Sequence, residues 1–219
     1  MSRLLVGCIL AVAWVAAAGG SSAAGAEPPR AIVLTESKGF DHDVVKPKEG
    51  KPSRVDEIFD KLAGEAKLFT AEKTRDASTI TPEKLKNTRL IVFYTTGELP
   101  MTEEQFKAFD QWIKDGGAFL GIHSATDTFH KPPFHDGYNK IINGEFDGHP
   151  WTQDDIVTLK VLDDQHPATK GFPQGFTHQE EIYQFKNFDP GQVRVLISLD
   201  MEKTAKKKPR YVPVAWCRN

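Results

Sequence analysis

Three short apolar runs in the first part of the chain predict buried strands. They span residues 31–34, 90–94 and 118–122, and none of them contains a charged residue. Runs of this length without polar alternation are typical of parallel strands that are covered on both faces. Residues 67–69 form a weaker strand candidate between the first two. The pattern therefore indicates a mostly parallel sheet with a layer on each side.

Helical patterns separate these runs. One helix is predicted after Ser53, where apolar side chains recur at helical spacing (Val55, Ile58, Phe59 and Leu62). A second is predicted from Thr102 to about residue 115, because Thr102 and Gln105 fit a capping box and Gly116 can end the helix. Strands that alternate with helices predict right-handed crossovers and a doubly wound α/β fold.

The character of the chain changes after residue 122. Residues 123–152 are rich in Gly, Pro, His and aromatic side chains and show little periodicity. A long stretch of this kind inside a domain is usually functional or disordered, and its aromatic residues argue against disorder. Strand-like patterns resume further on, at residues 156–162, 182–185, 193–199 and 211–216.

Composition narrows the class of protein. The 219 residues are 39% hydrophobic and carry a formal net charge of −2, which suits one globular domain. Without a basic excess we expect no binding to nucleic acid. The composition leaves the oligomeric state open.

The N-terminus has the pattern of an export signal. Arg3 precedes an uncharged apolar run over residues 4–18 and then a stretch of small residues that ends in Ala24-Gly25-Ala26, so we expect a signal peptide over residues 1–26 and a mature chain from Glu27. The alternative is a membrane anchor, but the run is shorter than the roughly 20 residues that span a bilayer. We therefore expect a periplasmic or secreted protein, not bound to the membrane after cleavage, with Cys217 as its one thiol.

One strand end carries the first chemical candidate. Gly121-Ile122-His123-Ser124-Ala125 follows a predicted strand, and its small residues suit the sharp elbow that pushes a strained central residue into a cleft. Ligands of open α/β sheets bind at such carboxyl ends. His123 is therefore a candidate general base, proton shuttle or metal ligand. The alternative is a histidine that only fills a turn.

Further polar residues follow the elbow. Glu181 and Tyr183 share one strand face, and Glu181 is a second acid/base candidate if that face lines the cleft. His149 and His166 are candidate ligands for a divalent ion such as Zn or Mn, although both histidines precede proline and suit turns equally well. We expect four side chains to bind substrate: Ser124, Glu145, Trp151 and Tyr183.

The order of several short motifs resembles the ThuA-like (trehalose utilisation) family across nearly the whole mature chain. The motifs are residues 121–125, Gly144-Glu145-Phe146 with His149-Pro150, His166-Pro167, 180–183 and 213–216. The resemblance implies a single domain over 27–219 with a class I glutamine amidotransferase-like, flavodoxin-like three-layer sandwich. It also implies that the sequence stops before the last segment of the family.

The resemblance implies a function as well. The amidotransferase-like elbow holds His123 where those enzymes carry a nucleophilic cysteine, so we expect no glutaminase activity. We expect action on a carbohydrate or an oxidised sugar derivative, with His123 and Glu181 as the acid/base pair of a cleft lined by residues 143–151 and 178–183. Two alternatives stay open: a sugar-binding domain without catalysis, and a metal-dependent hydrolase of a non-sugar substrate.

Overall fold

The first strand, β1 (Arg30–Leu34), is buried on both faces, and its alternate residues belong to two different hydrophobic cores. Ile32 and Leu34 lie in one core, whereas Ala31 and Val33 lie in the other. A strand of this kind requires a layer on each side of its sheet. The computed structural model, which describes residues 28–204 and 211–218, thus confirms the predicted covered sheet. The expected signal peptide lies outside the described residues.

Two compact units make up the chain. The parallel-sheet unit holds residues 28–146 and Lys186–Phe188, and the antiparallel-sheet unit holds Asp147–Phe185 and the residues from Asp189 onward. The single domain expected from the sequence stays a prediction. No helix in the described part of the chain is long and apolar enough to cross a membrane.

Four parallel strands form the sheet of the first unit, in the order β2-β1-β3-β4. The other three are β2 (Thr70–Thr74), β3 (Thr88–Phe93) and β4 (Ala118–Gly121). The three apolar runs are therefore neighbouring parallel strands, as predicted. The weaker prediction at residues 67–69 was wrong by about three residues, because β2 is an edge strand and needs less apolar surface than the strands inside the sheet.

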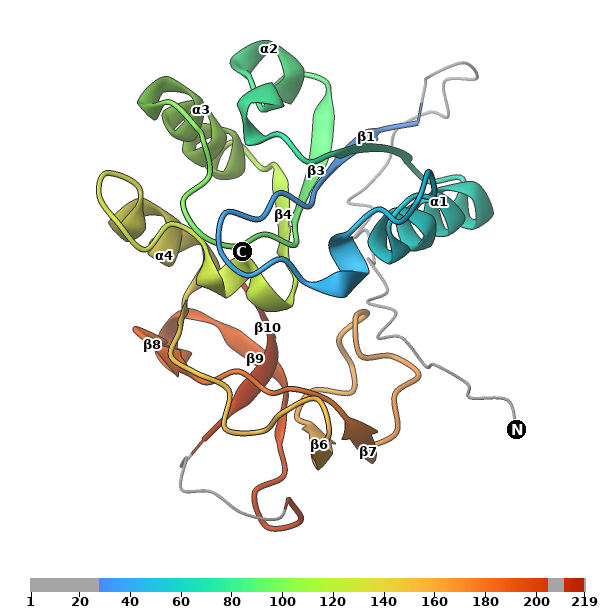
Figure 1. The fold of residues 1–219 in the computed structure, drawn as a ribbon. Coiled ribbons are helices and arrows are strands. Elements are labelled where there is room, and N and C mark those ends of the chain that lie inside the picture. The colour runs from blue at the N-terminus through green and yellow to red at the C-terminus, as the bar shows by residue number, and fades with distance from the viewer. Residues whose placement is uncertain (1–27, 205–210, 219) are drawn as a thin grey trace. The chain divides into compact units, whose positions relative to one another are not determined.

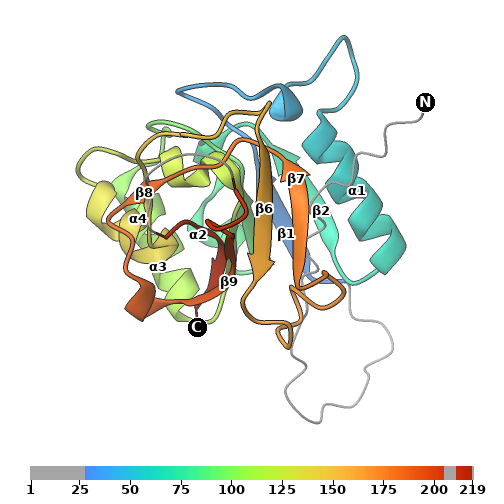
Figure 2. The same cartoon turned by 90° about the horizontal axis from the view of Figure 1, so that it is seen from below.

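Helices cover both faces of this sheet (Figures 1 and 2). The helix α1 (Arg54–Ala66) packs Val55 and Phe59 into one core, and α3 (Glu103–Lys114) packs Phe106 and Phe109 into the other. Thr102 and Gln105 form the predicted capping box at the start of α3. The remaining helices of the unit are α2 (Pro82–Leu85), α4 (His135–Ile142) and the 3-10 turns η1 (Asp43–Val45), η2 (Ala77–Thr79) and η3 (His123–Asp127).

An antiparallel sheet of order β10-β9-β6-β7 forms the second unit. In β6 (Ile156–Val161) buried and more exposed residues alternate, because only one of its faces packs on the core around Trp151. Its other elements are β7 (Gly175–Gln179), η4 (Pro190–Gln192), β9 (Arg194–Leu199) and β10 (Pro213–Cys217). The two-residue strands β5 (Glu145–Phe146) and β8 (Phe185–Lys186) lie where the chain passes from one unit to the other.

The stretch after residue 122 is more regular than its sequence pattern suggests. It contains η3 and the two-turn helix α4, in which only Tyr138 and Ile142 are buried. Two buried positions are too few to produce a visible helical period in the sequence. The strand expected at residues 182–185 is reduced to a bridge between Ile182 and Trp151 and to the start of β8.

Candidate functional site

The carboxyl ends of three neighbouring strands carry the candidate site. His42 lies in the segment after β1, Tyr94 directly follows β3, and His123 opens η3 just after β4. From β1 the chain crosses to β2 on one side, and β3 and β4 lie on the other side. This reversal of strand order is where open α/β sheets bind their ligands.

The turn after β4 is strained at its central residue, as the sequence predicted. Ile122 is extended, but His123 has a φ of +48°, a region that side chains other than glycine rarely adopt. A Cβ on Gly121 would lie 2.9 Å from Cδ1 of Ile142 and 3.2 Å from Cβ of Ala125. A larger residue at this position would have to displace Ile142 and Ala125, so the glycine favours the tight packing of the turn.

A second histidine, which the sequence reasoning did not single out, faces His123. The Nε2 atoms of His42 and His123 lie 3.2 Å apart, and the two ring planes are nearly perpendicular. The ring of Tyr94 lies beside both imidazoles, with centroids 5.8 Å and 5.7 Å away. His42 follows the first predicted strand. This position after a strand was the one feature of the sequence that could have marked His42 as a candidate site residue.

The segment that carries His42 is tied to the sheet. The Thr96 hydroxyl accepts a hydrogen bond from the amide of Gly39 and donates one to the carbonyl of Phe40. The guanidinium of Arg75 donates to both carboxylate oxygens of Asp41. These bonds fix the backbone on both sides of Phe40, whose ring packs edge-on against His42 while 70% of the residue is exposed.

Opposing influences act on the imidazole of His42. Burial, the largest of them, lowers its pKa, and the charge of Lys46 acts in the same direction. The carboxylates of Asp127, Asp41 and Asp43 oppose this change. Burial prevails, so the pKa of His42 lies below its usual value.

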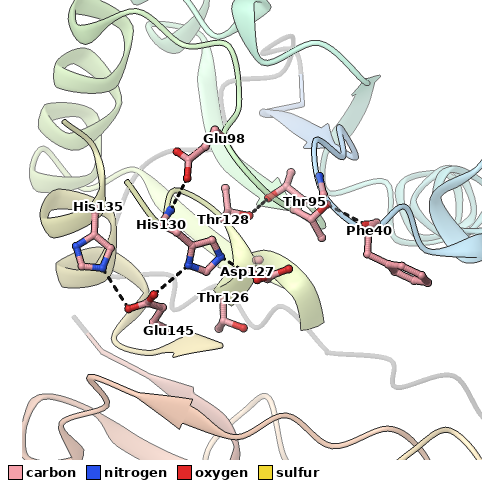
Figure 3. A network of polar contacts seen from close by, with 12 residues as sticks. Phe40, Thr95, Glu98, Thr126, Asp127, Thr128, His130, His135 and Glu145 are labelled. Atoms are coloured by element: carbon pink, nitrogen blue, oxygen red, sulfur yellow. Dashed lines mark hydrogen bonds and ion pairs between the residues drawn. The ribbon is translucent and has the colours of Figure 1, made fainter. Parts of the chain in front are cut away.

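A polar network surrounds Glu145 in the same unit (Figure 3). The Glu145 carboxylate accepts hydrogen bonds from Nδ1 of His130 at 3.0 Å and from Nε2 of His135 at 3.1 Å. Lys186 and Asn187 contact the same carboxylate, each at 3.0 Å. The second ring nitrogen of His130 lies 2.8 Å from Oδ1 of Asp127. His130 thus links η3 to β5 between two carboxylates.

The hydrogen bonds favour the charged forms of His130 and Glu145. The hydrogen bond to Asp127 raises the pKa of His130 to about 9, against the effect of burial and with help from Glu145. Burial alone would raise the pKa of Glu145, but the bonds from His130, Lys186 and His135 lower it to about 2. Hydrogen bonds to Glu145 and Asp136 also raise the pKa of His135. His130 and Glu145 therefore form an ion pair at neutral pH.

A crevice of about 10 Å³, open to solvent and with room for about one water molecule, adjoins this network. Side chains of η3 and α4 line it together with Glu145, which was predicted to bind substrate and is only 8% exposed. Ser124, another predicted substrate ligand, is fully buried beside the strained His123. Its hydroxyl has no hydrogen-bond partner among the described residues.

The antiparallel-sheet unit brings three of the predicted residues together. Nδ1 of His149 lies 3.4 Å from Oε1 of Glu181, and the ring of His149 stacks on Tyr183. Trp151 is almost completely buried in the core of this unit. Because Glu181 and His123 belong to different units, their predicted acid/base pairing stays a prediction.

The predicted metal ligands have different neighbours. Nδ1 of His166 accepts a hydrogen bond from the amide of Ala168, and its Nε2 lies 3.6 Å from the sulfur of Cys217. His149 contacts Glu181 instead. In the described part of the chain, neither histidine joins a group of three or more converging His, Cys, Asp or Glu ligand atoms. Their role as metal ligands stays a prediction.

Comparison with known proteins identifies the family. The sequence model of the ThuA family, described as trehalose utilisation, matches residues 30–219. The chain belongs to the ThuA family. No curated protein sequence matches the chain.

Solved structures of other ThuA-like proteins are similar to this chain. A ThuA-like protein from Bacteroides uniformis is 25% identical, with a TM-score of 0.67 over 90% of this chain and 81% of that one. Another from Parabacteroides merdae is 17% identical, with a TM-score of 0.63 over 88% and 75%. A glutamine amidotransferase from Thermotoga maritima is 13% identical, with a TM-score of 0.44 over 86% and 71%. This ThuA chain thus has the mixed α/β fold of the solved ThuA-like proteins, with the parallel sheet that its sequence predicted.

Proposed function

We propose that this ThuA domain is an enzyme that acts on a carbohydrate or an oxidised sugar derivative, with its reacting centre at His42 and His123. The observation that carries the proposal is the strained His123 at the carboxyl end of β4, with its Nε2 atom 3.2 Å from that of His42, which follows β1 at the switch point of the sheet. Strain of this kind persists where the surrounding structure enforces it and is concentrated at functional sites.

The pair is suited to moving a proton. Two N–H groups cannot face each other at 3.2 Å, so at least one of the two Nε2 atoms is unprotonated and can accept a proton. A substrate hydroxyl or a water molecule at the pair would supply that proton. The ring of Tyr94 packs against both imidazoles and limits how they turn.

Two observations favour a sugar as the substrate. The family is described as trehalose utilisation. In addition, Phe40 exposes 70% of its surface next to His42, and an exposed aromatic ring can pack against the apolar face of a sugar. Export, expected from residues 1–26, belongs to the same proposal and would place the enzyme where it meets sugars outside the cytoplasm.

Glu181 is proposed as a second acid/base group. Its carboxylate is paired with His149 and lies near Tyr183, so three residues singled out from the sequence form one cluster. A Glu181→Gln variant keeps the shape of this side chain and removes its charge. We expect it to lower kcat without lowering the melting temperature.

Activity assays on the purified chain test the proposal. Trehalose, other disaccharides and their ketone-oxidised derivatives are offered to the wild type and to His123→Asn, because asparagine tolerates a positive φ. We expect the variant to lose roughly 10²- to 10⁴-fold in kcat, the contribution of a positioned acid or base. The control is Gln192→Asn, in η4 of the other unit and outside the expected cleft.

Three outcomes would contradict the proposal. Turnover that survives unchanged in His123→Asn would remove this residue from the reaction. Sugar binding without turnover in the wild type would favour the alternative of a non-catalytic sugar-binding domain. Turnover of esters or amides in place of sugars would favour a hydrolase of non-sugar substrates.

A further inference from the structure

We propose that the Nε2 atoms of His42 and His123 together bind one divalent transition-metal ion, with Zn²⁺ as the best fit. Neutral imidazole nitrogens are common ligands of this ion. Neither His42 nor this pairing stands out in the sequence, because 80 residues separate the two histidines along the chain. The fold brings them together at the ends of β1 and β4.

The distance between the two nitrogens fits a shared ion. With metal–nitrogen distances of about 2.0–2.1 Å and tetrahedral angles, two ligand nitrogens of one zinc ion lie about 3.3 Å apart. The observed separation is 3.2 Å. The same separation suits an N–H···N hydrogen bond, which is how the pair is held when no ion is bound.

Both ligands are held in place before any ion arrives. The carbonyl of His123 accepts a hydrogen bond from the Thr126 hydroxyl, and the carbonyl of His42 accepts one from the amide of Val45. The bonds of Thr96 and Arg75 described above hold the segment that precedes His42. A binding site on such a fixed backbone loses little conformational entropy when it takes up the ion.

The charges around the pair nearly balance. The carboxylates of Asp127, Asp41 and Asp43 act on the ring of His42, together with the ammonium group of Lys46. Each carboxylate is also paired with a basic side chain: Asp127 with His130, Asp41 with Arg75 and Asp43 with Lys46. The proposed site therefore rests on the geometry of its two nitrogen atoms.

A metal ion at this pair would be part of the reacting centre, and its role in the reaction rests on the proposed function. With both Nε2 atoms bound to the ion, neither imidazole would accept the proton at that atom, and a water polarised by Zn²⁺, with its pKa lowered toward 7, would supply the base instead. The binding of the ion itself is a separate property that needs no substrate.

Metal binding is measured directly on the chain, prepared without a histidine tag. After dialysis against a chelator, Zn²⁺ is titrated by calorimetry into the wild type, His42→Asn and His123→Asn, with His178→Asn as control. Co²⁺ is titrated in parallel because its visible spectrum reports tetrahedral coordination. We expect one ion per chain in the wild type and control, and at least a tenfold weaker binding in each of the two site variants.

The proposal is overturned if the wild type binds neither ion more tightly than the two site variants do. Circular dichroism of each variant shows whether it has kept the fold, and any variant that has not is replaced by His42→Gln or His123→Gly. Failure here with an inactive His123→Asn would leave the proposed function standing. Metal binding without sugar turnover would support the metal site and contradict the proposed function.

Discussion

Nδ1 of His130 lies 3.0 Å from Oε1 of Glu145, and this contact joins two segments that are 15 residues apart in the parallel-sheet unit. The carboxylate is nearly buried and has three further partners, so it is kept ionised by its neighbours. A buried carboxylate with paired donors is strongly dependent on each of them, because removal of one leaves a poorly compensated charge.

The pH dependence of stability is expected to follow this network. The pKa of His130 is raised from 6.5 to about 9, so its contribution is fully present below pH 6.5 and is lost as the pH rises through 9. The pKa of Glu145 is lowered from 4.5 to about 2, so its contribution is present above pH 4.5 and is lost as the pH falls through 2. We expect the contribution of the pair to the free energy of unfolding to be greatest between pH 4.5 and 6.5.

Urea denaturation of His130→Gln at several pH values checks this expectation. The variant lacks the titrating group, so its free energy of unfolding should fall less than that of the wild type between pH 6.5 and 9. His178→Gln, which removes an imidazole from β7, should keep the slope of the wild type. Equal slopes for wild type and His130→Gln would show that the network does not stabilise the fold.

The elbow after β4 should not tolerate a larger residue at Gly121. A branched side chain there meets Ile142 and Ala125, so we expect Gly121→Val to lower the free energy of unfolding by about 1–3 kcal/mol. The control is Gly64→Ala in α1, where nothing lies within 4 Å of the added Cβ. That change should raise stability by about 0.5–1 kcal/mol. An unchanged free energy of unfolding in Gly121→Val would contradict the tight packing of the turn.

Phe40 should contribute to the binding of a sugar rather than to its turnover. Removing the ring in Phe40→Ala should raise KM by up to roughly tenfold and leave kcat nearly unchanged, because the ring contacts substrate away from the proton acceptor. Phe40→Trp should keep the affinity. Leu68→Ala removes another exposed apolar side chain, 58% exposed, and serves as control. A loss in kcat alone would mean that Phe40 acts by positioning His42.

Export can be tested by mass spectrometry. Protein recovered from its native host should begin at Glu27, because the sequence Ala24-Gly25-Ala26 suits a signal peptidase. An intact N-terminus carrying residues 1–26 would contradict the proposed location.

The sheet and its helices could be read from local sequence patterns. Continuous apolar runs predicted β1, β3 and β4, and the capping box of Thr102 and Gln105 predicted the start of α3. These features depend on residues close together in the chain. The antiparallel strand β7 has no such signature, because its residues alternate between half-buried and exposed and none is fully buried.

In the candidate site, too, one part follows from local sequence and another part only from the tertiary structure. The elbow at His123 is a local motif, and its small residues alone predicted a strained turn at a strand end. His42 and the donors around Glu145 come from distant segments, and only the strand order β2-β1-β3-β4 and the packing of α4 bring them together. Periodicity in a sequence reports which faces are buried, whereas the pairing of polar side chains depends on strand order and register. The sequence by itself determined the covered parallel sheet and the position of His123, and only the tertiary structure decided which side chains surround them.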